Sequence, residues 1–298
     1  MLVAHRFGGE WTDLKLDVMG DYFGSYATAL KNQVFQCWYI DAFAGTGDRV
    51  DRRDKHTKSP DSLFGAEAEA VATAKEGSVQ IALGIDPPFS RYLFIDRSRD
   101  HVSRLTAFRS AHPARSIDIV SGDANEELLK LCSSTDWSQT RAAVFIDPYG
   151  MQVNWSTLEK LAQTQAVDIA LLFPTGSLNR LLKRDGNIPA EWARRIDEHL
   201  GECDWRSAFY RKTVKTDLFD AVTATEKNVD IAGLQEFVMD RLRGIFAYVH
   251  EEAVPLKNSK GSVLYDLFIV CANPSKKAIA LSKRLAKGAV RAAAKSRI

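Results

Sequence analysis

Two short segments of the chain place an acid directly before a proline and close to an aromatic residue. GIDPPF contains Asp86, and FIDPYG contains Asp147, Pro148 and Tyr149. A carboxylate held by a stiff proline can accept hydrogen bonds from a substrate amine, and an aromatic ring can stack on a planar substrate. Such a set can align an amine for group transfer. The position of each segment in the fold decides which one is functional.

Further candidate residues follow a predicted strand near the N-terminus. The stretch 36–47 is typical of a buried strand that runs into a glycine turn. Its glycines let the backbone turn tightly and approach a ligand closely. The turn has neither the GK[ST] of a phosphate loop nor the spacing of GxGxxG, and alone it is equally consistent with a plain strand–helix connection. The candidates in this turn are Asp41, Phe43, Gly45 and Gly47.

Acids also end the second and third predicted strands. Asp96 precedes Arg97, and Asp123 precedes Ala124. An acid at the end of the second strand can accept hydrogen bonds from ribose hydroxyls, and one at the end of the third can reach an adenine edge. Each acid alone is more simply explained as a helix N-cap. Because the carboxyl ends of parallel strands meet at one sheet edge, these acids together with Asp41 indicate a nucleoside-shaped site.

The elements that must position these residues alternate between strands and helices. This alternation predicts an α/β fold, in which right-handed crossovers build a parallel sheet with helices on both faces. Apolar residues at helical spacing predict an amphipathic helix over 12–31 that covers one sheet face. The remaining predicted strands are 91–96, 116–123, 141–147 and 167–174, and the helices between them are 97–111, 124–133 and 155–164.

The pattern changes near Asp185. Residues 185–240 are charged and mainly helical in pattern, without a clear strand until about residue 245, and we expect an insertion there. The stretches 245–256 and 263–274 flank a turn and predict an antiparallel hairpin. The expected organisation is a core over 1–184, a helical insertion over 185–240 and completion of the core over 241–298.

Strand order separates the two acid–proline segments. GIDPPF lies between the glycine turn and the strand at 91–96, where a double proline favours a rigid connection. FIDPYG ends the fourth predicted strand, beside the ends of the first three. Position therefore favours Asp147 as the functional acid. Alternatively, Asp147 only orders the loop that follows the strand.

In this order the motifs resemble a class I S-adenosylmethionine-dependent methyltransferase, through the D-x-F-A-G-x-G turn, the acids on the second and third strands, and the final hairpin. More narrowly, the chain is similar to the bacterial three-Cys-motif partner protein family over most of residues 11–275. The matching elements are the N-terminal helix with Lys15, YIDAFAGTG, Ser59-Pro60, YLFID, VFIDPYGM with Trp155, and VDIALLFP. The resemblance implies a Rossmann-like fold with a seven-stranded, mostly parallel sheet that ends in an antiparallel hairpin.

The resemblance also implies S-adenosylmethionine as cofactor and assigns roles to the candidate residues. Asp147, Pro148 and Tyr149 would line the acceptor pocket, although Tyr149 replaces the second proline of the Asp-Pro-Pro-aromatic form used by amino-methyltransferases. The cofactor's methionine part would contact Asp41, Phe43, Gly45 and Gly47, its ribose Asp96 and Arg97, and its adenine Asp123 and Ala124.

Three functions are compatible with these residues. The first is a methyltransferase acting on a nucleic acid base. The second is a non-catalytic, methyltransferase-like subunit that binds a genomically linked protein of the three-Cys-motif type. The third is a nicotinamide-dependent oxidoreductase, against which the spacing of the glycine turn and the final hairpin argue.

Two basic segments are candidates for contact with nucleic acid. The loop 48–60 holds more cations than acids, and the tail 275–298 holds eight Lys or Arg and no acid. Basic residues on a helix can meet phosphates, but both segments are also compatible with a solvated surface. The net charge of +2 does not by itself indicate a polyanion partner.

Composition excludes several other classes. No apolar run approaches the roughly 18 residues of a membrane span, and no secretory signal is present, so we expect a cytoplasmic protein that does not enter a membrane. The four cysteines form no CxxC pair and the six histidines lack metal-ligand spacing, so we expect no metal site.

Overall fold

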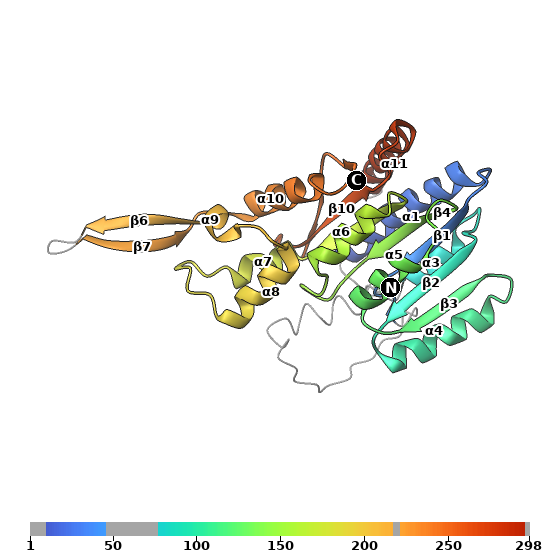
Figure 1. Cartoon of the computed structure of the whole chain (residues 1–298), viewed down its shortest axis with the longest axis horizontal. Helices are drawn as coiled ribbons and strands as arrows, with labels where there is room; N and C mark the ends of the chain where they lie inside the picture. The colour runs from blue at the N-terminus through green and yellow to red at the C-terminus, as the bar shows by residue number, and fades with distance from the viewer. Residues whose placement is uncertain (1–9, 46–76, 217–220, 296–298) are drawn as a thin grey trace, which may run out of the picture.

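The computed structural model describes residues 10–45, 77–216 and 221–295. A twisted mixed sheet forms its centre (Figure 1). The strands along the sheet, in spatial order, are β3 (Ile117–Ser121), β2 (Arg91–Asp96), β1 (Gln36–Asp41), β4 (Thr140–Ile146), β5 (Val167–Phe173), β10 (Val263–Cys271) and β8 (Tyr248–Val249). An eighth short strand, β9 (Val254–Lys257), pairs with β10 beside this path.

Strand direction identifies the fold. Strands β1 to β5 pair in parallel, whereas β10 runs antiparallel to both of its neighbours, β5 and β8. One reversed strand between β5 and β8 is the arrangement expected for a class I methyltransferase, so the predicted fold is confirmed. The prediction differs in one detail, since 245–256 forms two short strands that pair with different halves of β10.

Each face of the sheet is covered by its own layer of helices, because the parallel strands are apolar on both faces. In β1, Tyr39 packs in one apolar cluster, while Trp38 and Ile40 pack in the other. The first face carries α1 (Glu10–Leu30), α3 (Ser78–Gly84), α4 (Arg99–Ala111) and α11 (Lys276–Lys295). The second carries α5 (Ala124–Ser134), α6 (Trp155–Gln163), α7 (Thr175–Leu181), α8 (Ala190–Leu200) and α10 (Ile231–Arg243).

The N-terminal and C-terminal helices pack side by side on the first face. Small residues line the inner side of α11, where Ser282, Ala286, Ala289 and Ala293 are buried at helical spacing. Their size lets α11 approach α1 closely, while its cations lie on the outer side. Among the described residues, none of the helices combines the length and the apolar character needed to cross a membrane.

The expectation that residues 185–240 contain no clear strand is wrong. Between α9 (Trp205–Phe209) and α10, strands β6 (Tyr210–Thr216) and β7 (Ala221–Lys227) form a separate antiparallel ribbon that projects from the body (Figure 1). The helices expected in 185–240 are present as α8, α9 and much of α10. Strand β6 contains three β-branched residues, which favour an extended chain, but an exposed ribbon lacks the apolar face that usually reveals a strand.

We predict that Gly201→Ala strongly destabilises the junction between the insertion and the core. Gly201 follows α8 with a φ of +71°, and an added Cβ would lie 2.5 Å from Cδ1 of the buried Trp155. Backbone strain and overpacking each cost about 1–3 kcal/mol, which urea denaturation would measure. The matched control is Gly288→Ala inside α11, where a Cβ meets nothing within 4 Å and helix propensity favours alanine by about 1 kcal/mol. Equal effects of the two changes would contradict the prediction.

Candidate functional site

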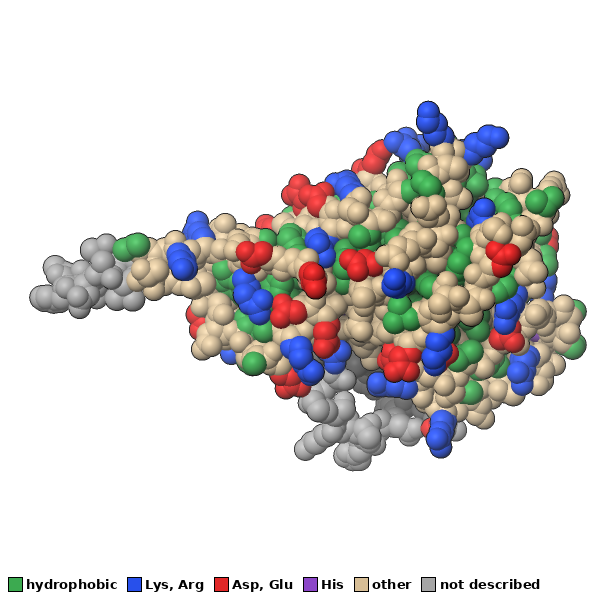
Figure 2. Space-filling model, viewed as in Figure 1, with side chains coloured by type: hydrophobic (Ala, Val, Ile, Leu, Met, Phe, Trp, Pro, Cys, Tyr) green, Lys and Arg blue, Asp and Glu red, His purple; other side chains and the backbone are tan. Residues whose placement is uncertain are grey.

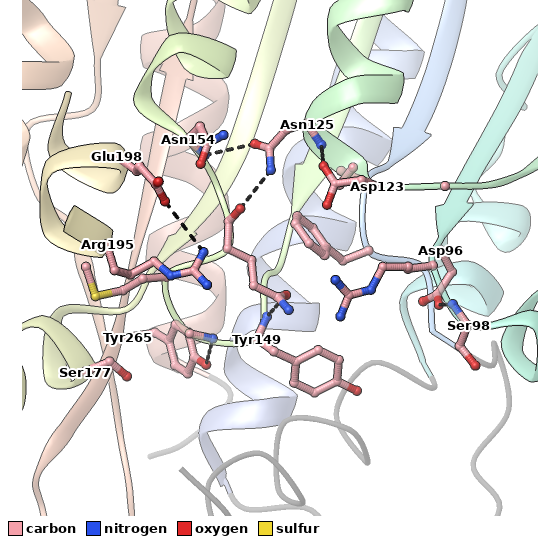
Figure 3. Close-up of a pocket in the computed structure, with 18 of the residues that line it drawn as sticks. Asp96, Ser98, Asp123, Asn125, Tyr149, Asn154, Ser177, Arg195, Glu198 and Tyr265 are labelled. Atoms are coloured by element: carbon pink, nitrogen blue, oxygen red, sulfur yellow. Dashed lines mark hydrogen bonds and ion pairs between the residues drawn. The ribbon is translucent and has the colours of Figure 1, made fainter. Parts of the chain in front are cut away.

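A cavity of about 580 Å³ lies at the carboxyl ends of the parallel strands. The turns after β1, β2, β3 and β4 line it on the core side, and α7 and α8 line it on the side of the insertion (Figure 3). Open α/β sheets bind ligands at this edge. Asp86 is not among its lining residues; it lies in the connection between α3 and β2, as predicted for GIDPPF.

Asp96 joins the end of β2 to the glycine turn after β1. Its Oδ2 accepts a hydrogen bond from the backbone N–H of Gly45 (2.9 Å), which has a φ of +65°. Its Oδ1 accepts hydrogen bonds from the N–H of Ser98 (2.7 Å) and from Nδ1 of His101 (3.1 Å). Burial raises the pKa of Asp96, but the hydrogen bonds from His101, Ser98 and Gly45 outweigh burial and leave that pKa below its usual value. The cavity wall thus contains a carboxylate that can accept hydrogen bonds from hydroxyl groups. Arg97 also lines the cavity.

Asp123 is both a helix cap and a lining residue of the cavity. It is the N-cap of α5, since its Oδ1 accepts hydrogen bonds from the N–H groups of Asn125 (2.9 Å) and Glu126 (3.4 Å), and it also lines the cavity. Ala124 lines the cavity beside it. Helix caps of this kind present further N–H groups to a ligand.

Sequence reasoning missed Asn125, which connects α5 to the loop after β4. Its Nδ2 donates to the carbonyl of Gln152 (2.9 Å), and its Oδ1 accepts from the N–H of Asn154 (2.9 Å) (Figure 3). The side chain of Gln152 in turn accepts from the N–H of Tyr149 (3.0 Å). Polar residues at a cap and in a loop give no sequence signal that they will meet.

Asp41 shapes the glycine turn from below the cavity. It is fully buried; its Oδ1 accepts from the N–H of Phe43 (3.1 Å), and its Oδ2 accepts from Oγ of Ser78 (2.7 Å). Phe43 lines the cavity, whereas Asp41 and Gly45 are not among its lining residues. Gly47 lies outside the described residues, as does the basic loop 48–60.

Asp147 is buried against the N-terminal helix. It is 1% exposed, and its Oδ2 lies 2.6 Å from Nζ of Lys15, which is 0% exposed. The same Nζ lies 5.2 Å from the ring centroid of Trp11. Oδ1 of Asp147 has no hydrogen-bond partner within the described parts of the chain. Pro148 is buried too, and neither residue is among those that line the cavity.

Lys15 was recognised as part of a motif but not as a partner of Asp147. It lies on the buried side of α1, one helical turn after Trp11 and before Met19. A cation at a core-facing position of an amphipathic helix is the signal that predicts a buried partner, because an unpaired buried charge is too costly.

Two tyrosines bring the loop after β4 to the cavity. Tyr149 lines the cavity, and the hydroxyl of Tyr265 on β10 accepts a hydrogen bond from the N–H of Gly150 (3.3 Å). The Tyr265 ring stacks on Trp11, with centroids 6.1 Å apart. Figure 3 shows Tyr149 and Tyr265 on the same side of the cavity. The cavity therefore has aromatic surface where a planar acceptor could lie.

Helix α8 supplies a charged wall opposite the core. Trp192, Arg194, Arg195 and Glu198 line the cavity, and Arg195 lies 3.9 Å from Glu198 (Figure 3). None of these residues was predicted from the sequence, because nothing in the local pattern shows where an insertion folds back. Across the described residues, no cluster of His, Cys, Asp and Glu could hold a metal ion.

His199 attaches α8 to the core, on the side of the helix that faces away from the cavity. Its Nδ1 donates to the carbonyl of Val153 (2.7 Å), and its ring lies 4.5 Å from that of Phe173. Burial lowers the pKa of His199 to about 4. The imidazole is therefore neutral in the folded protein at physiological pH.

The chain matches no protein-family model and no curated protein. Several solved structures are similar to it. A DUF519 protein from Legionella pneumophila covers 95% of this chain and 92% of its own, at 11% identity and a TM-score of 0.48. A S-adenosylmethionine-dependent methyltransferase from Clostridium acetobutylicum covers 85% and 90%, at 9% identity and a TM-score of 0.38. The N-terminal domain of EvdMO1, solved with S-adenosylhomocysteine and D-fucose, covers 85% and 82%, at 11% identity and a TM-score of 0.35.

We predict that Lys15→Met destabilises the protein by about 3–5 kcal/mol, because it leaves the Asp147 carboxylate buried without its counter-charge. Adding Asp147→Asn removes that charge, so the double variant should regain most of the lost stability. A double-mutant cycle measured by urea denaturation tests this expectation. If the two changes are additive, the ion pair has no energetic importance.

We also predict that acid weakens the attachment of α8. Because the pKa of His199 is about 4 in the folded protein against an ordinary 6.5, the unfolded chain binds the proton more tightly. The contribution of His199 to stability is complete above pH 6.5 and is lost, by up to about 3 kcal/mol, as the pH falls to 4. The stability difference between the wild type and His199→Gln should shrink over that interval in thermal unfolding experiments. A constant difference would show that this histidine is not responsible.

Proposed function

We propose that the protein is an S-adenosylmethionine-dependent methyltransferase that modifies an exocyclic amino group of a nucleic acid base. The class I methyltransferase strand order supports this proposal, because it brings Asp96, Asp123 and Tyr149 to one cavity. The narrower family resemblance, to three-Cys-motif partner proteins, is part of the same proposal. We also place the protein in a reducing cytoplasm, which suits its four unpaired cysteines.

The observation that carries the proposal is the unsatisfied oxygen of Asp147. Lys15 binds Oδ2, while Oδ1 is buried without a partner in the described regions. An unsatisfied buried acceptor costs about 1–3 kcal/mol. Asp147 lies behind the cavity lining, so an amino group would have to pass beside Tyr149 to donate to this oxygen. This hydrogen bond would favour a pyramidal, more nucleophilic nitrogen. Lys15 would hold the carboxylate in place during the transfer.

The core side of the cavity fits the cofactor. Asp96 would accept hydrogen bonds from the ribose hydroxyls, with Arg97 beside it. Asp123 and Ala124 would contact the adenine edge, and the turn from Asp41 to Gly47 would hold the methionine part. Within that turn Phe43 lines the cavity, whereas Asp41 acts by shaping the backbone. When bound, S-adenosylmethionine supplies an electrophilic methyl group, and the chain's own residues orient the acceptor amine toward it.

Other lining residues of the cavity would suit a nucleotide. Tyr149, Tyr265 and Trp192 offer aromatic surfaces for a base that has left its stack. Arg194 and Arg195 would contact phosphate. We include the basic helix α11 and the loop 48–60 as further phosphate contacts. All described cations of α11 are exposed, and of these Lys283 pairs with Glu251 (2.5 Å).

A specific observation favours a second candidate function, that of a methyltransferase-like subunit that binds a partner protein. Asp147 is held in an ion pair behind the cavity wall, and FIDPYG departs from the form used by amino-methyltransferases. A chain that retained only its cofactor-binding residues would have these features. In that case the three-Cys-motif protein would be the partner.

We predict that the protein binds S-adenosylmethionine and that Asp96→Ala weakens binding at least about tenfold, since hydrogen bonds to a charged group contribute about 1.5–3 kcal/mol. Titration calorimetry measures both affinities, and circular dichroism checks that the variant is folded. The matched control is Asp100→Ala, which removes an exposed acid from the first turn of α4. No binding by the wild type, or equal binding by both variants, would refute the cofactor assignment.

Transfer of a radiolabelled methyl group to DNA, RNA or protein then separates the two candidate functions. We expect label in a nucleic acid fraction, and none with the Lys15→Met/Asp147→Asn variant, although this variant should fold and bind the cofactor. Cofactor binding without transfer to any fraction would favour the partner-subunit function. Unchanged transfer by the double variant would show that Asp147 does not hold the acceptor.

A further inference from the structure

The ribbon of β6 and β7, which we call the arm, projects from the insertion (Figure 1). Each strand has seven residues, so the arm is about 20 Å long. Val214, in its outer half, is 67% exposed. Arg211, Lys212 and Thr223 are exposed as well. An isolated two-stranded ribbon is at best marginally stable in water, so contact with another molecule would stabilise the arm.

The base of the arm is tied to the wall of the cavity. The hydroxyl of Tyr210 donates to the carbonyl of Lys183 (2.8 Å), and Nζ of Lys227 donates to Oδ1 of Asn179 on α7 (2.6 Å). The loop between α7 and α8 passes so close that a Cβ on Gly186 would lie 2.8 Å from Thr225. Because α7 and α8 line the cavity, the arm has a defined position relative to it.

The charge of the arm is complementary to phosphate. Glu226 is the only acid in the two strands, and it lies 3.9 Å from Arg211. The exposed Lys183 and Arg184 extend the basic surface along the base, and Figure 2 shows basic side chains along the projecting arm. The connecting residues 217–220 include two aspartates and lie outside the described residues, so the argument rests on the strands. The described cations of the strands are Arg211, Lys212 and Lys227.

The shape and side chains of the arm fit one groove of nucleic acid. A two-stranded ribbon fits the major groove of B-DNA, which is about 12 Å wide, whereas the deep, narrow major groove of A-form RNA excludes it. The pairing register places Lys212 opposite Thr225 and Val214 opposite Thr223, so these four residues share one face. Lys212 can contact guanine, and Val214 can contact the thymine methyl group. The hydroxyls of Thr223 and Thr225 can contact several base edges.

We propose that the arm binds in the major groove of duplex DNA and thereby presents a nearby base to the cavity. The part of the proposal that concerns binding to the groove depends only on the features of the arm. Presentation of the base rests on the proposed function, because a base must leave the duplex before it can reach a methyltransferase site.

The test is fluorescence anisotropy with a labelled DNA duplex of about 20 base pairs, two helical turns. We expect Arg211→Ala/Lys212→Ala to weaken binding at least about tenfold. The slope of log K against log salt should fall by about 1, since Arg211 would contact phosphate, Lys212 is assigned to a base, and each phosphate contact contributes about 0.9. The control is Arg104→Ala/Arg109→Ala on α4, at the opposite end of the sheet (Figure 1). The arm inference fails if the wild type does not bind the duplex or if both double variants bind equally well.

Duplex RNA of the same sequence tests the choice of groove. We expect weaker binding to RNA and no effect of the arm variant on it. Equal, arm-dependent binding to both duplexes would overturn the assignment to the DNA major groove.

A probe on the arm locates the contact directly. Val214→Cys introduces an exposed thiol, whereas burial raises the pKa of Cys37 to about 12 and that of Cys132 to about 11, so these native thiols react slowly at neutral pH. An environment-sensitive dye at position 214 should change its emission when duplex DNA is added. The same dye on Ala107→Cys, exposed on α4, should not change. An unchanged signal at 214 would contradict the proposal.

Calorimetry with S-adenosylmethionine separates this inference from the proposed function. The arm variant should keep the wild-type affinity for the cofactor, because the arm does not line the cavity. Arm-dependent DNA binding without methyl transfer would leave the arm inference intact and refute catalysis. Methyl transfer to DNA that is unaffected by the arm variant would refute the arm inference and leave catalysis intact.

Discussion

The contact on which the candidate site depends is the buried ion pair between Lys15 and Asp147. It joins two residues 132 positions apart and excludes solvent from both. A dry ion pair is tolerated only when its geometry is close and its partners are held firmly. The ion pair therefore fixes the position of α1 on the sheet, because Lys15 must lie next to the residue that follows β4. The stacking of Trp11 on Tyr265 extends the same contact to β10.

The Lys15–Asp147 ion pair also explains how α1, which does not line the cavity, can influence the shape of the cavity. Tyr265 lines the cavity and binds the backbone of Gly150, so α1 reaches the loop after β4 both through Asp147 and through β10. On the other side, His199 and the close approach of Gly201 to Trp155 fasten α8 to the core. The cavity thus lies between two walls that are each held by buried contacts. The arm extends from the second wall, where it can lengthen the contact surface without disturbing the first.

The core was predictable because its elements repeat a strong pattern. Apolar runs such as RYLFID and VDIALLF are buried in parallel strands, and each is followed by a helix. The arm was missed because its described strand residues form no continuous apolar face, so their mixture of cations and β-branched residues resembled a charged helix or loop. Asp123 caps α5 and also lines the cavity. The two interpretations of this residue were therefore compatible, because a helix that starts at the end of a strand has its N-cap at the cavity edge.

The sequence by itself determined the order of the core strands and helices and the position of FIDPYG at the end of the fourth strand. These follow from local periodicity and from the rule that parallel strands end at one edge. Only the tertiary structure decided that Asp147 faces Lys15, that Asn125 ties α5 to the loop after β4, and that α8 closes the cavity. The reason is physical: these contacts join residues far apart in the chain, and their energies depend on burial and distance, which no local pattern specifies.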